Sequence, residues 1–458
     1  MPESNRTHMD VFGSSGVRGV VNQGMDPAFA TQVAQAAGTV WAADRVAIAR
    51  DTRLSGEMLA DAVAAGLASV GTEVERLGVV PTPAAQAHAE REGIPAVLVT
   101  ASHNPPEFNG LKLVAADGGG LTVETLEAVE RTLIEESFET AEWDGIGACH
   151  RRTDAAANYV DQVVDAVDTE RIAAADLTVA IDPGNGAGCD TSPAIFRKLG
   201  CEVHTVHAQP DGRFPGRAPE PVPAELGDLS RLVRAADADL GIAHDGDADR
   251  AVFVDERGEP IDGDASLAAL ASAELGDGDA MVSAVNVSQR VVDAVEATGA
   301  ELDLTPIGAT YLSSRVRELQ AAGQPVPIAG EGNGGVFFPP YRLARDGAYG
   351  AARFLELVAE RPASEIVSPY DDYHFVQANL EYGEDTKRDR MIAAATAWAK
   401  GQDGTLDTTD GYRVDYGDAW VLMRESGTEP LVRAYAEARD RDRAESLLGE
   451  AVDVLEDA

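Results

Sequence analysis

Short runs of β-branched and aliphatic residues alternate along this sequence with alanine-rich stretches of helical length. Residues 46–49 and 97–99 predict two strands, and a helix is predicted between them at about 57–70. The alternation restarts near residues 177–181 and again near 281–285. Because this pattern is typical of units with mostly parallel strands, the sequence predicts an α/β fold.

The pattern also indicates several domains, since a chain of 458 residues is too long for one compact core. After about Ser368 the expected order is a strand, a helix, a polar loop at 401–410, two strands near 419–423 and 431–437, and a final helix. We therefore predict three similar mixed α/β domains around a central cleft, completed by a smaller C-terminal α+β domain. The predicted boundaries are 1–150, 151–254, 255–366 and 367–458.

The chain is strongly acidic, with 78 aspartates and glutamates against 37 lysines and arginines and a net charge of −41. Only four of the basic residues are lysines. Such self-repulsion destabilises a compact fold at low ionic strength, whereas in molar salt the Debye length falls to about 3 Å. We therefore predict a halophilic protein. No basic stripe exists to hold a phosphate backbone, which argues against a nucleic-acid partner.

The three cysteines are odd in number and lack metal-ligand spacing, so they are expected to be reduced thiols. The first ten residues are polar, and no apolar run approaches the roughly 20 residues that a membrane span needs. We expect a soluble, cytoplasmic protein without a membrane partner. The residues do not indicate an oligomeric state.

Three apolar runs end in polar loops that begin at Thr100, His244 and Gly330. Ligands of open α/β sheets collect at the carboxyl ends of strands. We therefore expect each loop to face one shared site, with a fourth loop supplied by the last domain.

The loop at 245–250 (DGDADR) places Asp245, Asp247 and Asp249 at alternate positions. The mutual repulsion of these carboxylates is relieved most simply by a hard divalent cation, which predicts a metal site. An EF-hand is an alternative because Glu256 would occupy its position 12, but Arg250 stands where that loop needs glycine. A haloacid-dehalogenase-like phosphotransferase and a solvated acidic turn are two further alternatives.

The loop at 100–106 (TASHNPP) presents Ser102 at a strand end and is closed by prolines. Taken alone, this is a rigid turn. A hydrolase with His103 as base is disfavoured, because adjacent residues rarely pair as nucleophile and base and because Gly-x-Ser-x-Gly is absent.

Two more loops have the composition of binding loops. Residues 424–430 (RESGTEP) and Arg433 supply guanidinium groups, hydroxyls and a glycine, which can form an anion cradle or an ordinary hairpin turn. Residues 330–335 (GEGNGG) fit a dinucleotide-binding pattern, but no helix follows. The cluster at 184–188 (GNGAG) keeps a nicotinamide-dependent oxidoreductase open as an alternative, although no ribose-binding acid stands out.

In this order and spacing, the four loops resemble those of the α-D-phosphohexomutase family, which includes phosphoglucomutase, phosphomannomutase and phosphoglucosamine mutase. The resemblance extends to residues 12–19 (FGSSGVRG), 50–53 (RDTR), 80–83 (VPTP) and 109–112 (NGLK), and so to nearly the whole chain. It implies a heart-shaped, four-domain isomerase. Such an enzyme interconverts the 1-phospho and 6-phospho forms of a hexose through a phosphoserine and a bisphosphorylated sugar.

The resemblance also implies residue roles. Ser102 would be the phosphoserine, and it would bind Mg²⁺ together with Asp245, Asp247 and Asp249. The remaining catalytic residues would be Arg18, His103, Lys112 and Arg250, with the proton-transferring group left open among the first three. Sugar hydroxyls would be held by Glu331 and Asn333. The non-reacting phosphate would be held by Arg424, Ser426, Gly427, Thr428 and Arg433.

The third-domain loop departs from the common Gly-Glu-x-Ser-Gly-His pattern, because Asn333 replaces the serine and Gly335 the histidine. This form resembles the loop of archaeal phosphoglucosamine mutases and phosphomannomutase-like members. It slightly favours phosphoglucosamine mutase, with phosphoglucomutase/phosphomannomutase as the alternative. The expected ligands are a hexose phosphate and its bisphosphate.

Overall fold

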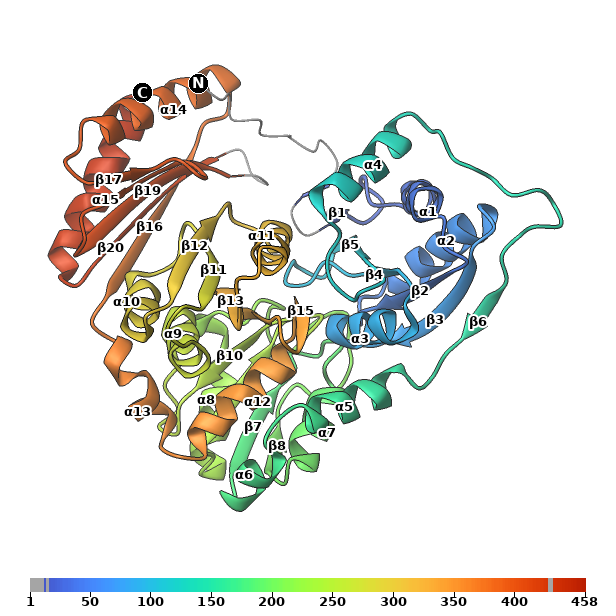
Figure 1. The fold of residues 1–458 in the computed structure, drawn as a ribbon, viewed down its shortest axis with the longest axis horizontal. Helices are drawn as coiled ribbons and strands as arrows, with labels where there is room; N and C mark the ends of the chain where they lie inside the picture. The colour runs from blue at the N-terminus through green and yellow to red at the C-terminus, as the bar shows by residue number, and fades with distance from the viewer. Residues whose placement is uncertain (1–11, 14–15, 427–430) are drawn as a thin grey trace. The chain divides into compact units, whose positions relative to one another are not determined.

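The computed structural model describes residues 12–13, 16–426 and 431–458 (Figure 1). The chain forms two compact units. Unit 1 comprises Met1–Gly263 with Asn333–Ile366, and unit 2 comprises Asp264–Gly332 with Val367–Ala458.

Unit 1 begins with an α/β layer structure whose parallel strands were predicted from the alternating pattern. Its elements are β1 (Val17–Val20), α1 (Pro27–Trp41), β2 (Arg45–Arg50), α2 (Gly56–Ser69), β3 (Glu73–Val79), α3 (Thr82–Glu92), β4 (Ala96–Val99), β5 (Phe108–Val114), α4 (Val123–Ile134) and β6 (Cys149–Arg151). The strand order is β1-β5-β4-β2-β3-β6. β2 runs parallel to β3 and β4, and β5 runs antiparallel to β4. The connection from β2 to β3 and the one from β3 back to β4 run in opposite directions, so α2 and α3 cover opposite faces of the sheet (Figure 1).

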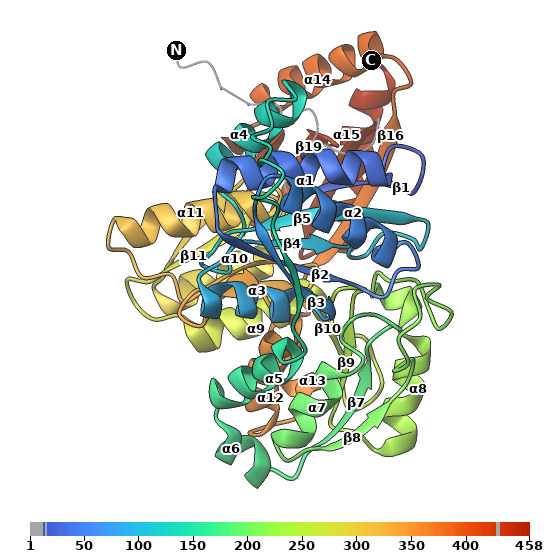
Figure 2. The same cartoon turned by 90° about the vertical axis from the view of Figure 1, so that its right-hand side faces the viewer.

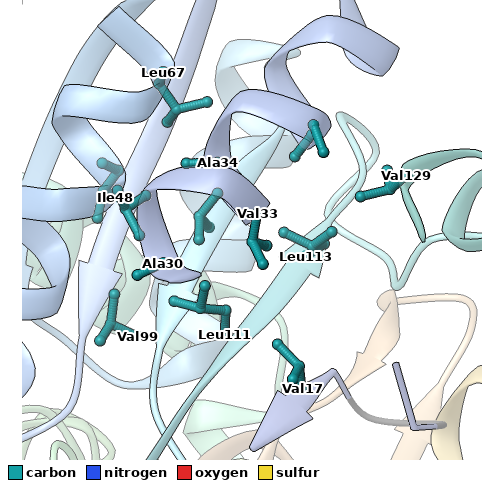
Figure 3. Close-up of a cluster of buried hydrophobic side chains, with 14 of the residues drawn as sticks. Val17, Ala30, Val33, Ala34, Ile48, Leu67, Val99, Leu111, Leu113 and Val129 are labelled. Atoms are coloured by element: carbon teal, nitrogen blue, oxygen red, sulfur yellow. The ribbon is translucent and has the colours of Figure 1, made fainter. Parts of the chain in front are cut away.

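The core of this first sheet lies under α1, which presents small and branched side chains to the strands. Figure 3 shows Ala30, Val33 and Ala34 of α1 beside Leu111 of β5. Burying a valine or leucine side chain contributes about 1.5–3 kcal/mol, so this cluster fixes the sheet that carries the loops. α1 and α2 pack closely because Gly66 has no side chain: a Cβ there would lie 2.5 Å from a backbone carbonyl of α1.

The second sheet of unit 1 has the strand order β10-β9-β7-β8. Its elements are α5 (Ala155–Asp165), α6 (Thr169–Ala174), β7 (Thr178–Asp182), α7 (Thr191–Lys198), β8 (Glu202–Thr205), η1 (Pro223–Glu225), α8 (Gly227–Ala236), β9 (Leu240–His244) and β10 (Ala251–Val254). β7 is parallel to β8 and β9, whereas β10 is antiparallel to β9. α7 and α8 cover opposite faces of this sheet (Figure 2).

A segment from later in the chain completes unit 1. It contains β14 (Gly335–Phe338), β15 (Arg342–Arg345), α12 (Gly347–Val358) and α13 (Ala363–Val367). Phe354 of α12 stacks on Phe253 of β10, with ring centroids 4.4 Å apart. α12 is thereby packed against the second sheet.

Unit 2 contains the parallel strands β12, β11 and β13, followed in the chain by an antiparallel sheet of order β16-β20-β19-β18-β17. Its elements are α9 (Gly263–Glu274), β11 (Ala280–Ala284), α10 (Gln289–Thr298), β12 (Glu301–Thr305), α11 (Ala309–Ala321), β13 (Ile328–Glu331), η2 (Ser368–Tyr370), β16 (His374–Glu381), α14 (Asp385–Lys400), β17 (Thr405–Asp407), β18 (Tyr412–Asp415), β19 (Ala419–Glu425), β20 (Leu431–Ala438) and α15 (Arg441–Glu456). The three α/β domains and the smaller C-terminal domain confirm the predicted fold class.

Two strands of the C-terminal sheet were not predicted. β17 lies inside the segment 401–410, which was predicted to be a loop, and β18 follows it directly. Both are short and polar, so their sequences lack the run of apolar residues that identifies a strand. Pairing with β19, rather than local propensity, makes β18 a strand.

A buried carboxylate joins the two parts of unit 2. Glu437 of β20 is fully buried and accepts hydrogen bonds from Ser288 Oγ at 2.5 Å, from Gln289 N at 2.7 Å and from Trp420 Nε1 at 2.8 Å. Because a buried charge is costly unless its oxygens are hydrogen-bonded, these three donors make the junction specific.

The structure also answers two smaller questions. No disulfide joins the three cysteines, as expected. Within the described residues, no helix combines the length and the apolar character that a transmembrane helix requires.

Candidate functional site

Ser102 lies at the end of β4, as predicted, and its backbone is held in an unusual conformation. Its φ angle is 51°, in the left-handed region that residues other than glycine rarely adopt. Thr100 stabilises this turn by accepting a hydrogen bond from the Ser102 backbone N–H at 2.9 Å. The side chain is almost fully buried, and its hydroxyl lies within hydrogen-bond distance of Asp245.

Arg53 lies beneath this turn and holds it together. Its guanidinium is fully buried and donates to the carbonyl oxygens of Ser102 at 2.9 Å, Asn104 at 2.6 Å and Pro105 at 2.5 Å. Asp51 in turn accepts from Arg53 Nε at 3.0 Å. Arg53 has no predicted role, although Asp-x-Arg directly after a strand is the sequence signal that could have identified it.

The three aspartates of the loop at 245–250, the predicted metal-binding loop, lie together between β9 and β10. Asp245, Asp247 and Asp249 are all buried, and one carboxylate oxygen from each lies within 4.8 Å of the others. The Oδ1 atoms of Asp247 and Asp249 are buried without a hydrogen bond. Two buried carboxylate oxygens without a hydrogen-bond donor fit a hard divalent cation.

The EF-hand alternative does not fit this geometry. The chain continues from Arg250 directly into β10, where a calcium loop would keep turning. Glu256, the required twelfth ligand, instead accepts a hydrogen bond from Ser364 N at 3.1 Å.

Hydrogen bonds connect the serine loop to the aspartates. Ser102 Oγ donates to Asp245 Oδ2 at 2.7 Å, and Lys112 Nζ donates to Oδ2 of Asp247 at 2.7 Å and of Asp249 at 2.8 Å. Loops that are far apart in the sequence therefore form one cluster in unit 1.

Thr82 is a further member of this cluster that sequence analysis did not assign. Its Oγ1 donates to Asp247 Oδ2 at 2.6 Å, and its N–H donates to the Asp247 carbonyl at 2.9 Å. The signal for it was the motif at 80–83, where prolines flank a threonine at the start of α3.

The cluster shifts the pKa values of its acids in opposite directions. Burial, together with repulsion from Asp247 and Asp249, raises the pKa of Asp245 well above its usual range. Burial alone would also raise the pKa of Asp247, but the Lys112 ammonium and the Thr82 hydroxyl hold it below its usual range.

The cationic side chains predicted from the resemblance surround the same cluster. Arg18 donates to Asn104 Oδ1 at 2.8 Å, and burial lowers its pKa from the usual value. The backbone N–H of Arg250 donates to Asp245 Oδ1 at 3.2 Å. His103 Nδ1 lies 3.4 Å from Ser102 Oγ.

The environment makes His103 a weak base. Burial and the neighbouring Arg250 and Arg18 guanidiniums lower its pKa to about 2, so it is neutral at physiological pH. Burial also opposes the charge of Lys112, but Asp247 and Asp249 outweigh it and raise the pKa of Lys112.

The remaining predicted residues lie in other loops. Glu331 is buried at the end of β13, and Asn333 Oδ1 accepts from Gly335 N at 3.0 Å. Arg424 and Arg433 stand opposite each other in the pairing of β19 with β20. Ser426 N donates to Leu431 O at 2.9 Å. The predicted residues Gly427 and Thr428 lie outside the described residues.

The glycine cluster that left an oxidoreductase open has a packing role in this fold. Gly186 lies against the predicted metal-binding loop, where a Cβ would come within 2.5 Å of the Gly246 carbonyl oxygen. Ala187 N donates to the same oxygen at 2.9 Å. The glycines thus allow close approach of two backbones rather than of a dinucleotide.

Known protein families match this chain along almost its whole length. Four family descriptions match in order: the phosphoglucomutase/phosphomannomutase alpha/beta/alpha domains I, II and III at residues 9–140, 157–258 and 262–373, and the C-terminal domain at 376–454.

Individual relatives align over nearly their whole lengths. A phosphoglucomutase/phosphomannomutase of Thermococcus kodakarensis is 38% identical, with 98% of this chain and 99% of the relative covered. A probable phosphoglucosamine mutase of Methanopyrus kandleri is 37% identical, with 97% of each covered. The solved structure of a phosphoglucomutase/phosphomannomutase family protein from Burkholderia thailandensis has a TM-score of 0.85 at 29% identity, with 98% of each chain covered.

Since all four domains match in sequence order and the relatives cover almost the entire chain, this protein belongs to the α-D-phosphohexomutase family, whose members are isomerases.

Proposed function

We propose that this phosphohexomutase works through a phosphoserine at Ser102 and that the aspartate cluster holds the metal ion required for transfer. The observation that carries the proposal is the 2.7 Å hydrogen bond from Ser102 Oγ to Asp245 within a buried group of three carboxylates. A serine hydroxyl that is hydrogen-bonded to a cluster of potential metal ligands is the arrangement that a metal-assisted phosphoryl transfer needs.

The metal is proposed to be Mg²⁺, held by Asp245, Asp247 and Asp249 together with an oxygen of the serine phosphate. Support comes from the donor set, which consists only of oxygens, and from the two buried oxygens that lack hydrogen bonds. When bound, such an ion neutralises charge that develops on the phosphoryl oxygens.

The reaction follows from these parts. A sugar hydroxyl attacks the phosphorus of phospho-Ser102, the bond to Oγ breaks, and the hydroxyl proton leaves to a base. The resulting bisphosphate must turn around in the site, so that its other phosphoryl group returns to Ser102. Arg18, Lys112 and Arg250 are proposed to stabilise the negative charge of the transferring group.

Lys112 is proposed to manage the hydroxyl proton. It is one of only four lysines in a chain that otherwise uses arginine, and it lies in the site rather than on the surface. A lysine can give up a proton within an enzyme, whereas an arginine remains charged. Despite its burial, Asp247 and Asp249 raise the pKa of Lys112, so its ammonium must first release a proton before it can accept one from the sugar hydroxyl. A divalent cation on those two carboxylates would remove the attraction that holds this proton. His103 is a weaker base because its pKa is lowered to about 2.

The Lys112→Arg variant is therefore expected to lower kcat by about 10²-fold, because arginine keeps the positive charge but does not release a proton near neutral pH. Steady-state kinetics with saturating sugar phosphate would measure this. Lys198→Arg is the matched control, since Lys198 is half-exposed and pairs with the surface residue Asp161. Unchanged kcat in Lys112→Arg would remove the assignment.

The non-reacting phosphate is proposed to bind in the loop of Arg424, Ser426, Gly427, Thr428 and Arg433. Arg424 and Arg433 are directly paired across β19 and β20, and like charges in such pairs are unfavourable without a counter-ion. Asp410, 3.0 Å from Arg424, offsets part of this charge. A phosphate bound at the two guanidinium groups would lower their mutual repulsion further. Glu331 and Asn333 are proposed to bind sugar hydroxyls.

We propose glucosamine phosphate as the preferred substrate, with glucose and mannose phosphates as the alternatives. Support comes from the loop at 330–335, in which Asn333 and Gly335 replace the common serine and histidine. The curated relatives carry both kinds of name and so leave both open.

Parallel kinetics with glucosamine, glucose and mannose phosphates would test this preference. We expect kcat/KM to be at least about 10-fold higher for glucosamine phosphate, since one added hydrogen-bonded group is typically worth about 1.4 kcal/mol or more in discrimination. Equal or higher values for glucose or mannose phosphate would refute the preference without affecting the assignment of Ser102.

A further inference from the structure

A cavity of about 410 Å³ in unit 1 lies outside the cluster of Ser102 and the aspartates. Its walls are the carboxyl ends of β2 and β3, one face of α2, and the segment 151–156 that leads into α5. None of the residues that line it belongs to the proposed catalytic site.

The pairing between β2 and β3 is irregular where these strands line the cavity. In the pairing of β2 with β3, Ile48 faces Arg76 and Ala49 faces Gly78, so that Leu77 is an extra, unpaired residue. Bulges of this kind occur next to binding sites. The connections that leave β2 and β3 also run to opposite faces of the sheet, which is the position where open α/β sheets bind ligands.

The cavity carries an unusual charge for this protein. Four arginines, Arg50, Arg76, Arg151 and Arg152, line it with a single acidic residue, Glu57. Arg50 pairs with Glu57 at 2.6 Å and Arg152 pairs with Glu75 at 2.8 Å, so the guanidinium groups left to hold a ligand are those of Arg76 and Arg151. Such a concentration of guanidinium groups favours an anionic ligand.

Two of these arginines repel each other. Arg76 of β3 and Arg151 of β6 are register partners in parallel strands, so that their side chains lie on the same face of the sheet. Like charges in this relation are unfavourable. Arg76 pairs with Asp61, whose side chain is 60% exposed, and such surface pairs are weak. The side chain of Arg151 is exposed and has no ion pair or hydrogen bond within the part of the chain that the structure describes.

Apolar side chains form the rest of the wall. Ala60 and Leu77 are buried at the cavity, and Val79 is 41% exposed there. A ligand that carries a phosphate at one end and an apolar or ring-shaped part at the other would satisfy both surfaces. The volume is sufficient for a nucleotide or a sugar phosphate and does not require a macromolecular partner.

We propose that this arginine pocket is an effector site for a small phosphorylated molecule, whose phosphate is held by Arg76 and Arg151. Val80 lines the pocket and is followed in the chain by Pro81 and by Thr82, whose hydroxyl donates to Asp247. A ligand that moves the end of β3 would therefore also move Thr82, which lies only two residues beyond Val80, and with it the hydrogen bond from Thr82 to Asp247. This inference rests on geometry separate from the phosphoserine site.

Calorimetric titration tests the binding. Inorganic phosphate and AMP would each be titrated into the protein with a saturating hexose phosphate already present, so that the mutase site is filled. We expect one site per chain in each case, with tighter binding of AMP if the ring contacts Leu77 and Val79. Arg76→Gln/Arg151→Gln should weaken binding at least about 10-fold.

Two further variants keep the result interpretable. Arg231→Gln/Arg257→Gln removes the same charge from two exposed positions and should bind as the wild type does. Arg76→Lys/Arg151→Lys keeps the charge but loses the bidentate fork, so it should bind more weakly than the wild type even if the glutamine variant fails to fold. Absence of a site in the wild type, or equal binding in all variants, overturns the proposal.

The effector role is tested separately, by measuring turnover. Turnover at saturating hexose phosphate should change at least about 2-fold on addition of the probe that binds tighter, in the wild type and in Arg231→Gln/Arg257→Gln, but not in Arg76→Gln/Arg151→Gln. Binding without any change in turnover would contradict the effector role.

Discussion

Replacing Ser102 by alanine is expected to reduce mutase turnover by about 10³-fold or more, because the hydroxyl that we propose to accept and return the phosphoryl group is lost. The fold should survive. The side chain is small and already buried, and the turn is held through backbone atoms by Arg53 and Thr100. The melting temperature of the variant should therefore lie close to that of the wild type.

Intact-mass measurement adds a readout that does not depend on turnover. Wild-type protein incubated with a hexose bisphosphate should gain one phosphoryl group, and Ser102→Ala should gain none. Ser137→Ala, an exposed serine of the same domain, is the control for both measurements. Full mutase activity in Ser102→Ala, or the same mass increase in both proteins, would refute the phosphoserine mechanism.

The second large effect concerns Asp245, where function and stability are expected to change in opposite directions. Asp245→Asn should lower turnover by about 10²-fold or more, because a metal ligand loses its charge. In the metal-free protein the same change should raise the free energy of unfolding by about 1–3 kcal/mol. The reason is that three buried carboxylates repel one another, which also raises the pKa of Asp245.

The stabilisation should depend on pH with a definite sign. A carboxyl whose pKa is raised in the folded protein binds its proton more tightly there than in the unfolded chain, so stability falls as pH rises above the unfolded value of about 3.9. Asparagine does not titrate, so the Asp245→Asn variant does not lose stability in this way as the pH rises. Its advantage over the metal-free wild type should therefore be present near neutral pH and disappear at about pH 4 and below.

Chemical denaturation of protein treated with a chelator, with and without added Mg²⁺, would measure both effects. Mg²⁺ should stabilise the wild type by mass action and leave Asp245→Asn almost unchanged. Asp165→Asn, at an exposed position at the end of α5, controls for the general effect of removing one negative charge from an acidic chain. A destabilised metal-free Asp245→Asn would contradict the explanation based on repulsion.

The sequence predicted the positions of the loops better than it predicted the contacts between them. Ser102 and the three aspartates could be identified locally, because each loop follows an apolar strand and has an unusual polar composition. The roles assigned to them, and the domain boundaries, stay predictions. Arg53 and Thr82 were not identified, because their importance lies in contacts with residues about 50 and 165 positions away.

The arginine pocket illustrates the same limit. Nothing in the sequence relates Arg76 to Arg151, which are far apart in the chain and belong to strands of ordinary composition. Their register across β3 and β6, and the bulge at Leu77, exist only once the sheet has formed.

The amino-acid sequence by itself determined the α/β class, the acidic surface charge and the four polar loops, because these depend on hydrophobic periodicity and composition within short windows. The tertiary structure decided which donors meet which acceptors. It brings Lys112 and Thr82 to Asp247, places Arg53 beneath Ser102 and sets two arginines side by side at an open sheet edge. Those contacts arise from strand order and from the packing of helices across sheets, which no local pattern encodes.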